Sequence, residues 1–264
     1  MSTASESNPG APMLEVQDVT LRFGGVTALD KVSFNVSGGE MVALIGPNGA
    51  GKSSLLNVLS GFYKPQQGTV FYQGGNISGW PVHKIAASGL ARTFQGTHLL
   101  ARMSVVDNIM VGRFAQMSSN LLESFFYWPF AHREEIAHRE KAEEIIDFLE
   151  IEHIRHQPVG TLGYGMRKRV DLGRALAAEP KVLLLDEPMA GMNAEEKEDL
   201  ARFILDVREF KNIPVVLVEH DMGVVMDIAD RVVVLNFGRK IAEGTPAQVQ
   251  DDPEVISAYL GVKQ

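Results

Sequence analysis

The sequence lacks cysteine, an excess of positive charge and any long apolar run, and each absence excludes a class of function. Without cysteine, the chain cannot form disulfides or bind a metal through sulfur, a composition that suits the cytosol. Lys and Arg total 25 against 33 Asp and Glu, a formal net charge of −8. Because nucleic-acid binding needs a basic surface to neutralise phosphates, we expect no nucleic-acid partner.

No apolar stretch approaches the roughly 18–20 residues that cross a bilayer, so any membrane role is expected to come through a partner. Residues 1–12 have neither a basic start nor an apolar stretch, which predicts a short disordered tail and no secretory signal. Residues 13–264 contain no Pro/Ser-rich linker and no internal repeat, which predicts a single domain.

Hydrophobic periodicity predicts an α/β fold that begins with an antiparallel sheet. Apolar and polar residues alternate over 13–36, and a second strand pair is expected around 68–77. Residues 41–46, MVALIG, form a continuous apolar run that is typical of a buried parallel strand. Two similar runs follow, KVLLLDEP at 181–188 and PVVLVEHD at 214–221.

Helical patterns occupy the middle of the chain. Residues from about 98 to 170 are predicted to form a helical subdomain inserted into the α/β core, and 194–210 a helix between the later strands. The apolar residues expected on one face of the longest inserted helix are Ile136, Ile145, Ile146 and Leu149.

The strongest motif, GPNGAGKSS, matches the phosphate-binding pattern G-x4-G-K-[ST] between an apolar strand and a helical pattern. Its glycines let backbone N–H groups wrap phosphates, and the helix N-terminus adds a positive dipole end. Lys52 would reach the β- and γ-phosphates and Ser53 would bind Mg²⁺. The predicted nucleotide-binding residues are Gly46, Pro47, Asn48, Gly49, Ala50, Gly51, Lys52, Ser53 and Ser54. The alternative is a glycine-rich turn without a ligand.

VLLLDEP, at 182–188, is an apolar strand that ends in two carboxylates. Asp186 would hold Mg²⁺, directly or through water, and Glu187 would polarise the attacking water as a general base. By itself the motif could be a strand-end turn, but the upstream phosphate-binding loop favours the catalytic interpretation.

His220 follows the next parallel-strand pattern, and parallel strands end at the ligand edge of their sheet. We therefore expect His220 to reach the γ-phosphate and to hold the water with Glu187; a structural histidine is the alternative. Gln95, in GLARTFQGTHLL, could bind Mg²⁺ or water and sense the γ-phosphate, with a surface glutamine as the alternative.

In this order the motifs resemble those of one family, the ATP-binding subunits of ABC transporters, over about residues 14–261. The matches are Gly46–Ser53 to the Walker A motif, Gln95 to the Q-loop, Leu162, Gly163, Tyr164, Gly165 and Met166 to the signature, Val182–Glu187 to the Walker B motif and His220 to the switch histidine. Phe23 matches the aromatic residue that stacks on adenine, with a half-buried strand residue as the alternative. The resemblance implies ATP and Mg²⁺ as cofactors and ATP hydrolysis as the reaction.

The same resemblance implies a P-loop NTPase core of the ABC ATPase type, with an N-terminal antiparallel β subdomain and an inserted helical subdomain. The chain is further similar to subunits that power uptake of branched-chain or hydrophobic amino acids in bacteria. The stretches that carry this similarity are LRFGGVTALDKVSF, GLARTFQ, DEPMAGMN, VEHDM and GTPAQVQDDPEVISAYLG, together with a helical insertion around 114–141. Alternatives are importers of urea, aromatic or carboxylic acids, an exporter of lipid or lipopolysaccharide, and a soluble ATPase associated with nucleic acid or ribosomes.

An importer of this kind implies a peripheral position on the cytoplasmic face of the inner membrane. Its partners would be a second ATP-binding subunit, two transmembrane permease subunits and, indirectly, a periplasmic solute-binding protein. In the family, two ATP-binding subunits meet head to tail, and the signature of one holds the ATP on the P-loop of the other.

The signature departs from the family's Leu-Ser-Gly-Gly-Gln. Gly163 lacks the serine hydroxyl, whose hydrogen bond to a charged phosphate contributes about 1.5–3 kcal/mol, or about ten- to a hundredfold in affinity. The deficit falls on the partner's ATP, so we expect a different partner subunit and two unequal sites. Met166 and Asn193 replace the usual Gln and Asp, and the basic run 167–169 is expected on the exposed side of the signature helix.

Overall fold

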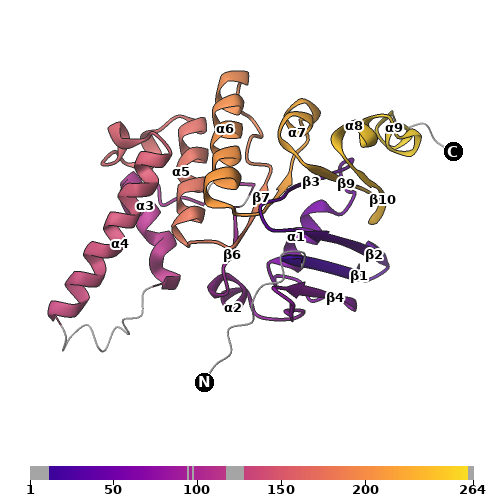
Figure 1. The fold of residues 1–264 in the computed structure, drawn as a ribbon, viewed down its shortest axis with the longest axis horizontal. Helices are drawn as coiled ribbons and strands as arrows, with labels where there is room; N and C mark the ends of the chain where they lie inside the picture. The colour runs from indigo at the N-terminus through magenta and orange to yellow at the C-terminus, as the bar shows by residue number, and fades with distance from the viewer. Residues whose placement is uncertain (1–11, 94, 97, 117–127, 261–264) are drawn as a thin grey trace.

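The computed structural model describes residues 12–93, 95–96, 98–116 and 128–260, and it builds them on two β-sheets (Figure 1). The antiparallel sheet has the order β2-β1-β4-β5, and the other sheet has the order β10-β9-β3-β8-β7-β6. The strands of the first sheet are β1 (Leu14–Phe23), β2 (Val26–Val36), β4 (Gln67–Tyr72) and β5 (Gly75–Asn76). The predicted tail lies largely outside the described residues, as does the part of the inserted segment at 117–127.

The second sheet is parallel except for its edge strand β10. Its strands are β3 (Met41–Ile45), β6 (Leu90–Arg92), β7 (Val182–Asp186), β8 (Val215–Val218), β9 (Arg231–Asn236) and β10 (Arg239–Gly244). All residues of β3, β7 and β8 are buried, which confirms the interpretation of the continuous apolar runs as buried parallel strands.

Helices cover the parallel sheet and form a separate lobe. The helices are α1 (Lys52–Leu59), α2 (Val82–Ala87), α3 (Val105–Gly112), α4 (Trp128–Phe148), α5 (Tyr164–Ala177), α6 (Ala194–Lys211), α7 (Met222–Ile228), α8 (Pro246–Gln250) and α9 (Pro253–Leu260), with 3-10 turns at Arg113–Gln116, Glu152–Ile154 and Val159–Thr161. In Figure 1, α3, α4 and α5 lie at the end of the molecule opposite the antiparallel sheet. No described helix is both long enough and apolar enough to cross a membrane.

The parallel sheet has a hydrophobic core on each face because its side chains alternate. In β7, Leu183 and Leu185 pack with α3–α6, whereas Val182 and Leu184 pack with α1 and the antiparallel sheet. A smaller cluster joins β3 and β9 to α7, α8 and α9. The two faces are therefore covered by different layers, which is the arrangement of an α/β fold.

The prediction that Ile136 shares a buried face with the later apolar residues of α4 was wrong. Ile136 is 46% exposed, whereas Ile145, Ile146 and Leu149 are buried against α3 and α5. Ile136 lies nine residues before Ile145, about two and a half helical turns, so the two side chains lie on opposite sides of the helix. His138 and Ala142 occupy the buried face in its place.

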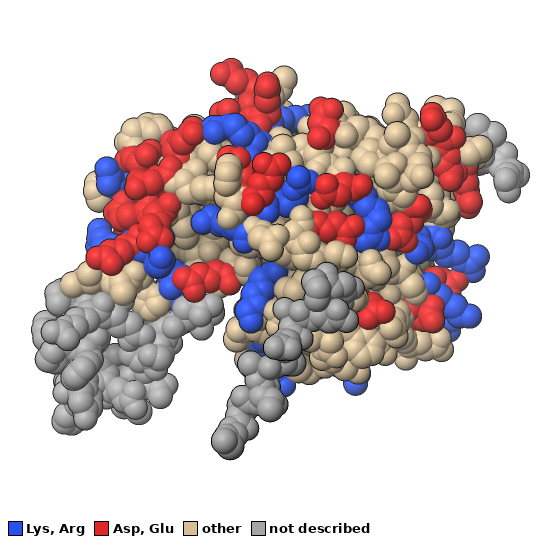
Figure 2. Space-filling view, in the orientation of Figure 1, with Lys and Arg blue, Asp and Glu red and all other residues tan. Residues whose placement is uncertain are grey.

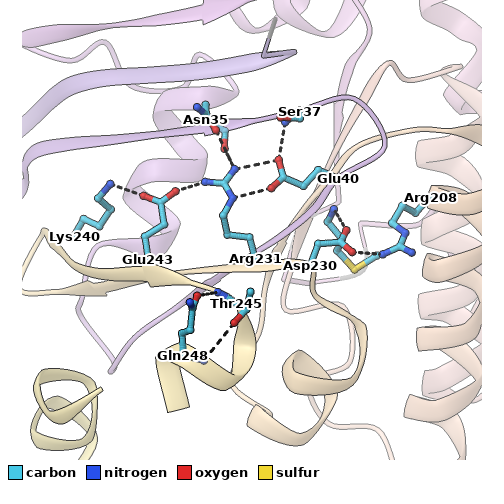
Figure 3. A network of polar contacts seen from close by, with 11 residues as sticks. Asn35, Ser37, Glu40, Arg208, Asp230, Arg231, Lys240, Glu243, Thr245 and Gln248 are labelled. Carbon is cyan, nitrogen blue, oxygen red and sulfur yellow. Dashed lines mark hydrogen bonds and ion pairs between the residues drawn. The ribbon is translucent and has the colours of Figure 1, made fainter. Parts of the chain in front are cut away.

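A network of polar contacts joins the amino ends of the parallel strands (Figure 3). Arg231, at the start of β9, donates to both carboxylate oxygens of Glu40 at 2.7 and 3.1 Å, to the backbone oxygen of Asn35 at 2.6 Å, and to Glu243. The network therefore connects β2, β9, β10 and the residue that precedes β3.

The molecular surface carries both signs of charge. On the face shown in Figure 2, Lys and Arg side chains are interspersed with Asp and Glu, and acidic side chains gather over the lobe that contains α4. Arg202 and Glu150 form an exposed ion pair at 2.9 Å.

Candidate functional site: a phosphate-binding loop beside a polar triad

The candidate phosphate-binding loop connects β3 to α1, where the strand–loop–helix motif predicts it. Gly46 follows β3 with φ of 146°, and a Cβ there would lie 2.0 Å from the backbone oxygen of Leu235. Only glycine fits such a close approach. Gly51, with φ of 106°, caps the N-terminus of α1, so the helix presents its amino end to the loop.

An open pocket of about 270 Å³ lies at this loop. It is lined by Val26, Thr27, Ala28, Asn48, Gly49, Ala50, Gly51, Lys52, Ser53, Ser54, Glu187 and His220. Gly46 and Pro47 do not line the pocket but accept hydrogen bonds from Lys52 through their carbonyl groups. The structure therefore brings residues 48–54 of the predicted loop together with two of the three predicted catalytic residues in one pocket.

Lys52 is buried at the base of the loop. Its Nζ donates to the backbone oxygens of Gly46, at 2.7 Å, and Pro47, at 3.0 Å. Burial lowers the pKa of Lys52, and the negative charges of Glu187 and Asp186 oppose part of that shift. The ammonium group is thus held by the loop carbonyls, within electrostatic range of the carboxylates at the end of β7.

Glu187, Gln95 and His220 form a polar triad. Gln95 Nε2 donates to Glu187 Oε2 at 2.7 Å, and His220 Nε2 forms a short contact with Glu187 Oε1. Parallel strands β7 and β8 deliver Glu187 and His220 to the same edge of the sheet, as expected from their order. Gln95 joins them from the segment after β6, although it does not line the pocket itself.

The backbone of Glu187 is left-handed, with φ of 48°, a conformation that non-glycine residues rarely adopt. Its N–H donates to Val218 at 2.9 Å, which fixes the turn against β8. Backbone strain of this kind persists where the surrounding structure over-determines the conformation, and it is common at functional sites.

The residues predicted to bind a metal are brought together less completely. Ser53 lines the pocket, but Asp186 Oδ2 accepts a hydrogen bond from Arg92 Nη2 at 2.8 Å, and the Gln95 amide donates to Glu187. Within the described ranges, no cluster of three or more His, Asp or Glu side chains could hold a metal ion. A Mg²⁺ ion bound with a nucleotide needs only one or two protein oxygens, because phosphates and water supply the rest.

Phe23 lies outside the pocket lining. It is 46% exposed, and its ring packs edge-to-face on Tyr63 with 5.0 Å between the ring centroids. Val26 and Thr27, just after it in the same hairpin, line the pocket. The side chain is therefore near the site and accessible, without a described contact to the loop.

The signature residues surround the N-terminus of α5 and do not line the chain's own pocket. Gly163 is the N-cap residue, and a Cβ there would meet no atom within 4 Å. A Cβ at Gly165, in contrast, would lie 2.5 Å from Glu196 Oε1 of α6. Leu162 is buried, Tyr164 is exposed and Met166 is half-buried against the helical core.

The expectation that residues 167–169 lie on the exposed side of the signature helix was wrong for two of them. Lys168 is 3% exposed and Arg169 8%. Most of α5 is enclosed by α3, α4 and α6, and each buried cation has a partner: Lys168 binds backbone oxygens, and Arg169 pairs with Asp199 at 2.7 Å. Charged side chains become buried when such partners replace water.

Sequence reasoning missed Arg92, Lys168 and Glu219. Arg92 binds Asp186. It also donates to Asn57 of α1 at 2.7 Å and to Ser60, the residue after α1, at 2.9 Å. Glu219 is buried and accepts N–H groups of Met189 and His220; burial raises its pKa, and these two bonds oppose the shift. A carboxylate directly before His220, at a buried strand end, was the available signal.

Comparison with known proteins gives concordant matches. The ABC transporter family matches residues 29–190, and the branched-chain amino acid ATP-binding cassette transporter family matches residues 239–263. The chain is 41% identical to the high-affinity branched-chain amino acid transport ATP-binding protein BraF of Pseudomonas aeruginosa, over 95% of this chain and 98% of that one. It is 39% identical to LivG of Escherichia coli K12, over 95% and 98% respectively.

Solved structures show the same architecture. The ADP conformation of MJ1267, an ATP-binding cassette of an ABC transporter, superposes with a TM-score of 0.84 and 34% identity, over 95% of this chain and 99% of that one. A nucleotide-free ATP-binding cassette from an ABC transporter gives 0.83 and 33%, over 94% and 99%. With the loop, the triad and the signature in one fold, these matches establish that the chain belongs to the ABC transporter family as an ATP-binding cassette.

Proposed function

We propose that this chain is the ATP-binding and ATP-hydrolysing subunit of an ABC importer for branched-chain amino acids. The observation that carries the proposal is the convergence of Gln95, Glu187 and His220 beside the phosphate-binding loop. The names of BraF and LivG, both branched-chain amino acid transport proteins, support the solute class.

The loop would bind ATP through its backbone and the Lys52 side chain, and Phe23 would add a contact from outside the loop. N–H groups of the loop and the amino end of α1 bind the phosphates, and Lys52 moves its ammonium group from the loop carbonyls to the β- and γ-phosphates. Phe23 would stack on adenine, since its exposed ring lies in the same hairpin as the pocket-lining Val26.

Hydrolysis would begin with Glu187. A carboxylate in this position accepts a proton from the water that attacks the γ-phosphorus atom. His220 and Gln95 contact the two oxygens of that carboxylate, so each orients it and can also orient the water. The left-handed backbone at Glu187 aims the side chain into this position.

Mg²⁺ fits the oxygen donors at the site. Ser53 lines the pocket and Asp186 is a buried carboxylate close enough to Lys52 to affect its pKa, so these two residues and the Gln95 amide would hold the ion. When bound, Mg²⁺ neutralises phosphate charge in the transition state.

The signature would act on a second subunit. Its residues at the start of α5 do not line the chain's own pocket, which leaves them available to a partner in the head-to-tail arrangement of the family. We infer a heterodimer with a different ATP-binding subunit because Gly163 offers no hydroxyl. The dimer would lie on the cytoplasmic face of the inner membrane, beneath two permease subunits that receive solute from a periplasmic binding protein.

An open groove of about 340 Å³ is the proposed docking site for a permease segment. The groove runs between α2, β6, α3 and α5, and Phe62 and Val82, both partly exposed, contribute to its apolar lining. An apolar groove with a few charged groups suits an amphipathic helix.

The test is affinity purification of the full chain from its native membranes in mild detergent, followed by ATPase assays on the product. A second ATP-binding subunit and two membrane subunits should co-purify, and ATP hydrolysis should require Mg²⁺. Reconstitution of the purified complex with its periplasmic binding protein should give uptake of leucine, isoleucine or valine.

Glu187→Gln in the same complex should retain ATP binding and lower kcat by about 10²–10⁴-fold, the contribution of a general base. Recovery of the chain with ribosomes or DNA, or a Glu187→Gln complex that hydrolyses ATP at the normal rate, would refute the proposal.

A further inference from the structure

Lys168 contacts the backbone of two residues of the polar triad and does not line the phosphate-binding pocket. It belongs to α5, is 3% exposed, and its Nζ donates to the backbone oxygens of Gln95, at 2.9 Å, and of Glu187, at 3.3 Å. These two acceptors come from segments that are far apart in the sequence and follow different strands, β6 and β7. One ammonium group therefore connects three elements.

Acidic side chains near Lys168 offset part of the cost of burying its charge. Burial lowers the pKa of Lys168, and the negative charges of Asp171, Glu219, Asp186 and Glu187 oppose that shift. An ammonium group also has three N–H donors and a flexible stem, so it can serve two carbonyl groups that diverge.

We propose that Lys168 is a positioning residue for ATP hydrolysis that holds the main chains of Gln95 and Glu187 at the spacing their side chains need. The inference rests on the proposed ATPase function. The side chains of the two residues meet at 2.7 Å and their carbonyl groups share Lys168, so both the side chains and the main chains of Gln95 and Glu187 are linked.

The bond to Glu187 has a second role. The left-handed backbone of this residue is strained, and such a conformation persists only where several contacts fix it. Its N–H binds Val218 and its carbonyl group binds Lys168, so the peptide units on both sides of the strained torsion angles are anchored.

Lys168 connects the signature to the residues of the polar triad. Helix α5 begins at Tyr164, within the signature, and Lys168 lies one turn further along the same helix. The signature, which serves the partner's ATP, is therefore attached through one side chain to the residues that hydrolyse this chain's own ATP.

The test compares Lys168→Met and Lys168→Arg with Arg169→Met in the purified complex. Methionine fills a similar volume without donating, whereas arginine retains charge and donors. Arg169 is the matched control because it is a neighbouring buried cation on α5 whose partner is Asp199, away from the triad.

We expect Lys168→Met to lower kcat by about 100-fold, the effect of a displacement of about 1 Å in a catalytic group. The KM for ATP should stay within about twofold of the normal value because the phosphate-binding loop is untouched. Lys168→Arg should recover a substantial part of kcat, and Arg169→Met should lower thermal stability without changing kcat.

Hydrogen exchange in the nucleotide-free protein gives a readout that does not depend on turnover. Peptides that contain Gln95 or Glu187 should exchange faster in Lys168→Met than in Arg169→Met. If Lys168→Met is not recovered folded, Lys168→Gln, which is too short to reach both carbonyl groups, takes its place in both measurements.

Normal kcat in Lys168→Met, or equal losses in Lys168→Met and Arg169→Met, would overturn the inference. Failure of the proposed function is distinguishable, because the unmodified complex would then hydrolyse no ATP. A complex that hydrolyses ATP, loses activity in Glu187→Gln and tolerates Lys168→Met would reject the role of Lys168 alone.

Discussion

At the scale of single residues, two glycines of the signature have opposite environments. Gly163 faces open space, whereas Gly165 lies where a Cβ would approach Glu196 Oε1 to 2.5 Å. Gly163 has φ of −59°, which any residue can adopt. A Cβ at 165 would therefore displace the Glu196 side chain, whereas a Cβ at 163 would displace nothing. The absence of a serine hydroxyl at 163 is not a steric necessity.

Gly163→Ser should restore the hydroxyl without cost to the fold. We expect the free energy of unfolding to change by no more than about 0.5 kcal/mol, because serine and glycine are both accepted at an N-cap. ATP binding at the partner's site should tighten by about tenfold, the value of one hydrogen bond to a charged group.

The measurement is nucleotide affinity of the assembled complex, with Gly163→Ala as the control. Alanine also fits the open space but donates no hydrogen bond. If serine and alanine give the same affinity, or if neither changes it, the two ATP sites of the complex are not made unequal by Gly163.

Local residue patterns predicted the loop well, because one short stretch holds the strand end, the glycines, Lys52 and the first turn of α1. They could not predict Arg92 or Lys168, since the partners of these cations belong to other strands and loops. The residue types at 95, 187 and 220 indicated that these residues act on the attacking water. Only the fold shows that Gln95 and His220 both contact Glu187.

At the scale of elements, α6 has a capping box at its N-terminus. Asn193 accepts from the N–H of Glu196 at 2.9 Å, and the Glu196 carboxylate accepts from the N–H of Asn193 at 3.1 Å. The same Glu196 packs against Gly165 of the signature, so the cap of one helix helps to fix the start of another. Asparagine caps helices as well as the aspartate usual in the family.

Asn193→Ala should destabilise the protein by about 1 kcal/mol, because it removes the side-chain cap. Asn193→Asp should leave stability within about 0.5 kcal/mol of the original, since both residues accept the same bond. Urea denaturation of the three proteins measures the difference. Unchanged stability in Asn193→Ala would show that the cap contributes nothing, and an equal loss in Asn193→Asp would show that the aspartate does not replace it.

Elements were predictable where burial on both faces gave a continuous apolar run, as in β3, β7 and β8. The orientation of α4 was harder to predict from the sequence. Apolar residues such as Ile136 also occur on exposed faces of helices, and the polar His138 lies on the buried face of α4. There, Arg113 Nε donates to His138 Nδ1 at 3.1 Å, a partnership that periodicity of apolar residues does not reveal.

At the scale of the whole molecule, Arg231 connects the two sheets by binding Glu40 and Asn35 (Figure 3). Burial raises the pKa of Glu40, but hydrogen bonds from Arg231 and Ser37 outweigh that effect and leave the pKa below its ordinary value. A lowered folded pKa means that this contribution to stability is present above the ordinary value and lost as the pH falls through the lowered one.

Arg231→Met should therefore destabilise the protein by about 2–3 kcal/mol at pH 7, because it leaves partly buried carboxylates unpaired. The difference from the unmodified protein should shrink below about pH 4, where Glu40 becomes protonated in the unfolded state and then in the folded state. Urea denaturation at both pH values measures it.

Arg239→Met is the control for this prediction. Arg239, in β10, is an exposed arginine that pairs with Asp30 of β2. Its loss should cost no more than about 1 kcal/mol at either pH. Equal losses of stability in the two variants, or a loss in Arg231→Met that does not depend on pH, would contradict a stabilising role for the Arg231–Glu40 pair.

The turn between β9 and β10 has a consequence for synthesis of the chain. The N–H of Gly238 donates to Ala50 in the phosphate-binding loop at 2.9 Å, and its carbonyl group accepts from Asp30 of β2 at 2.8 Å. Gly46 packs directly on Leu235 of the same hairpin. Because ribosomes add residues in order, the loop at 46–54 emerges nearly two hundred residues before the hairpin that supports it. A nascent chain thus carries its most recognisable motif early, yet completes the nucleotide site only after the hairpin of β9 and β10 has been made.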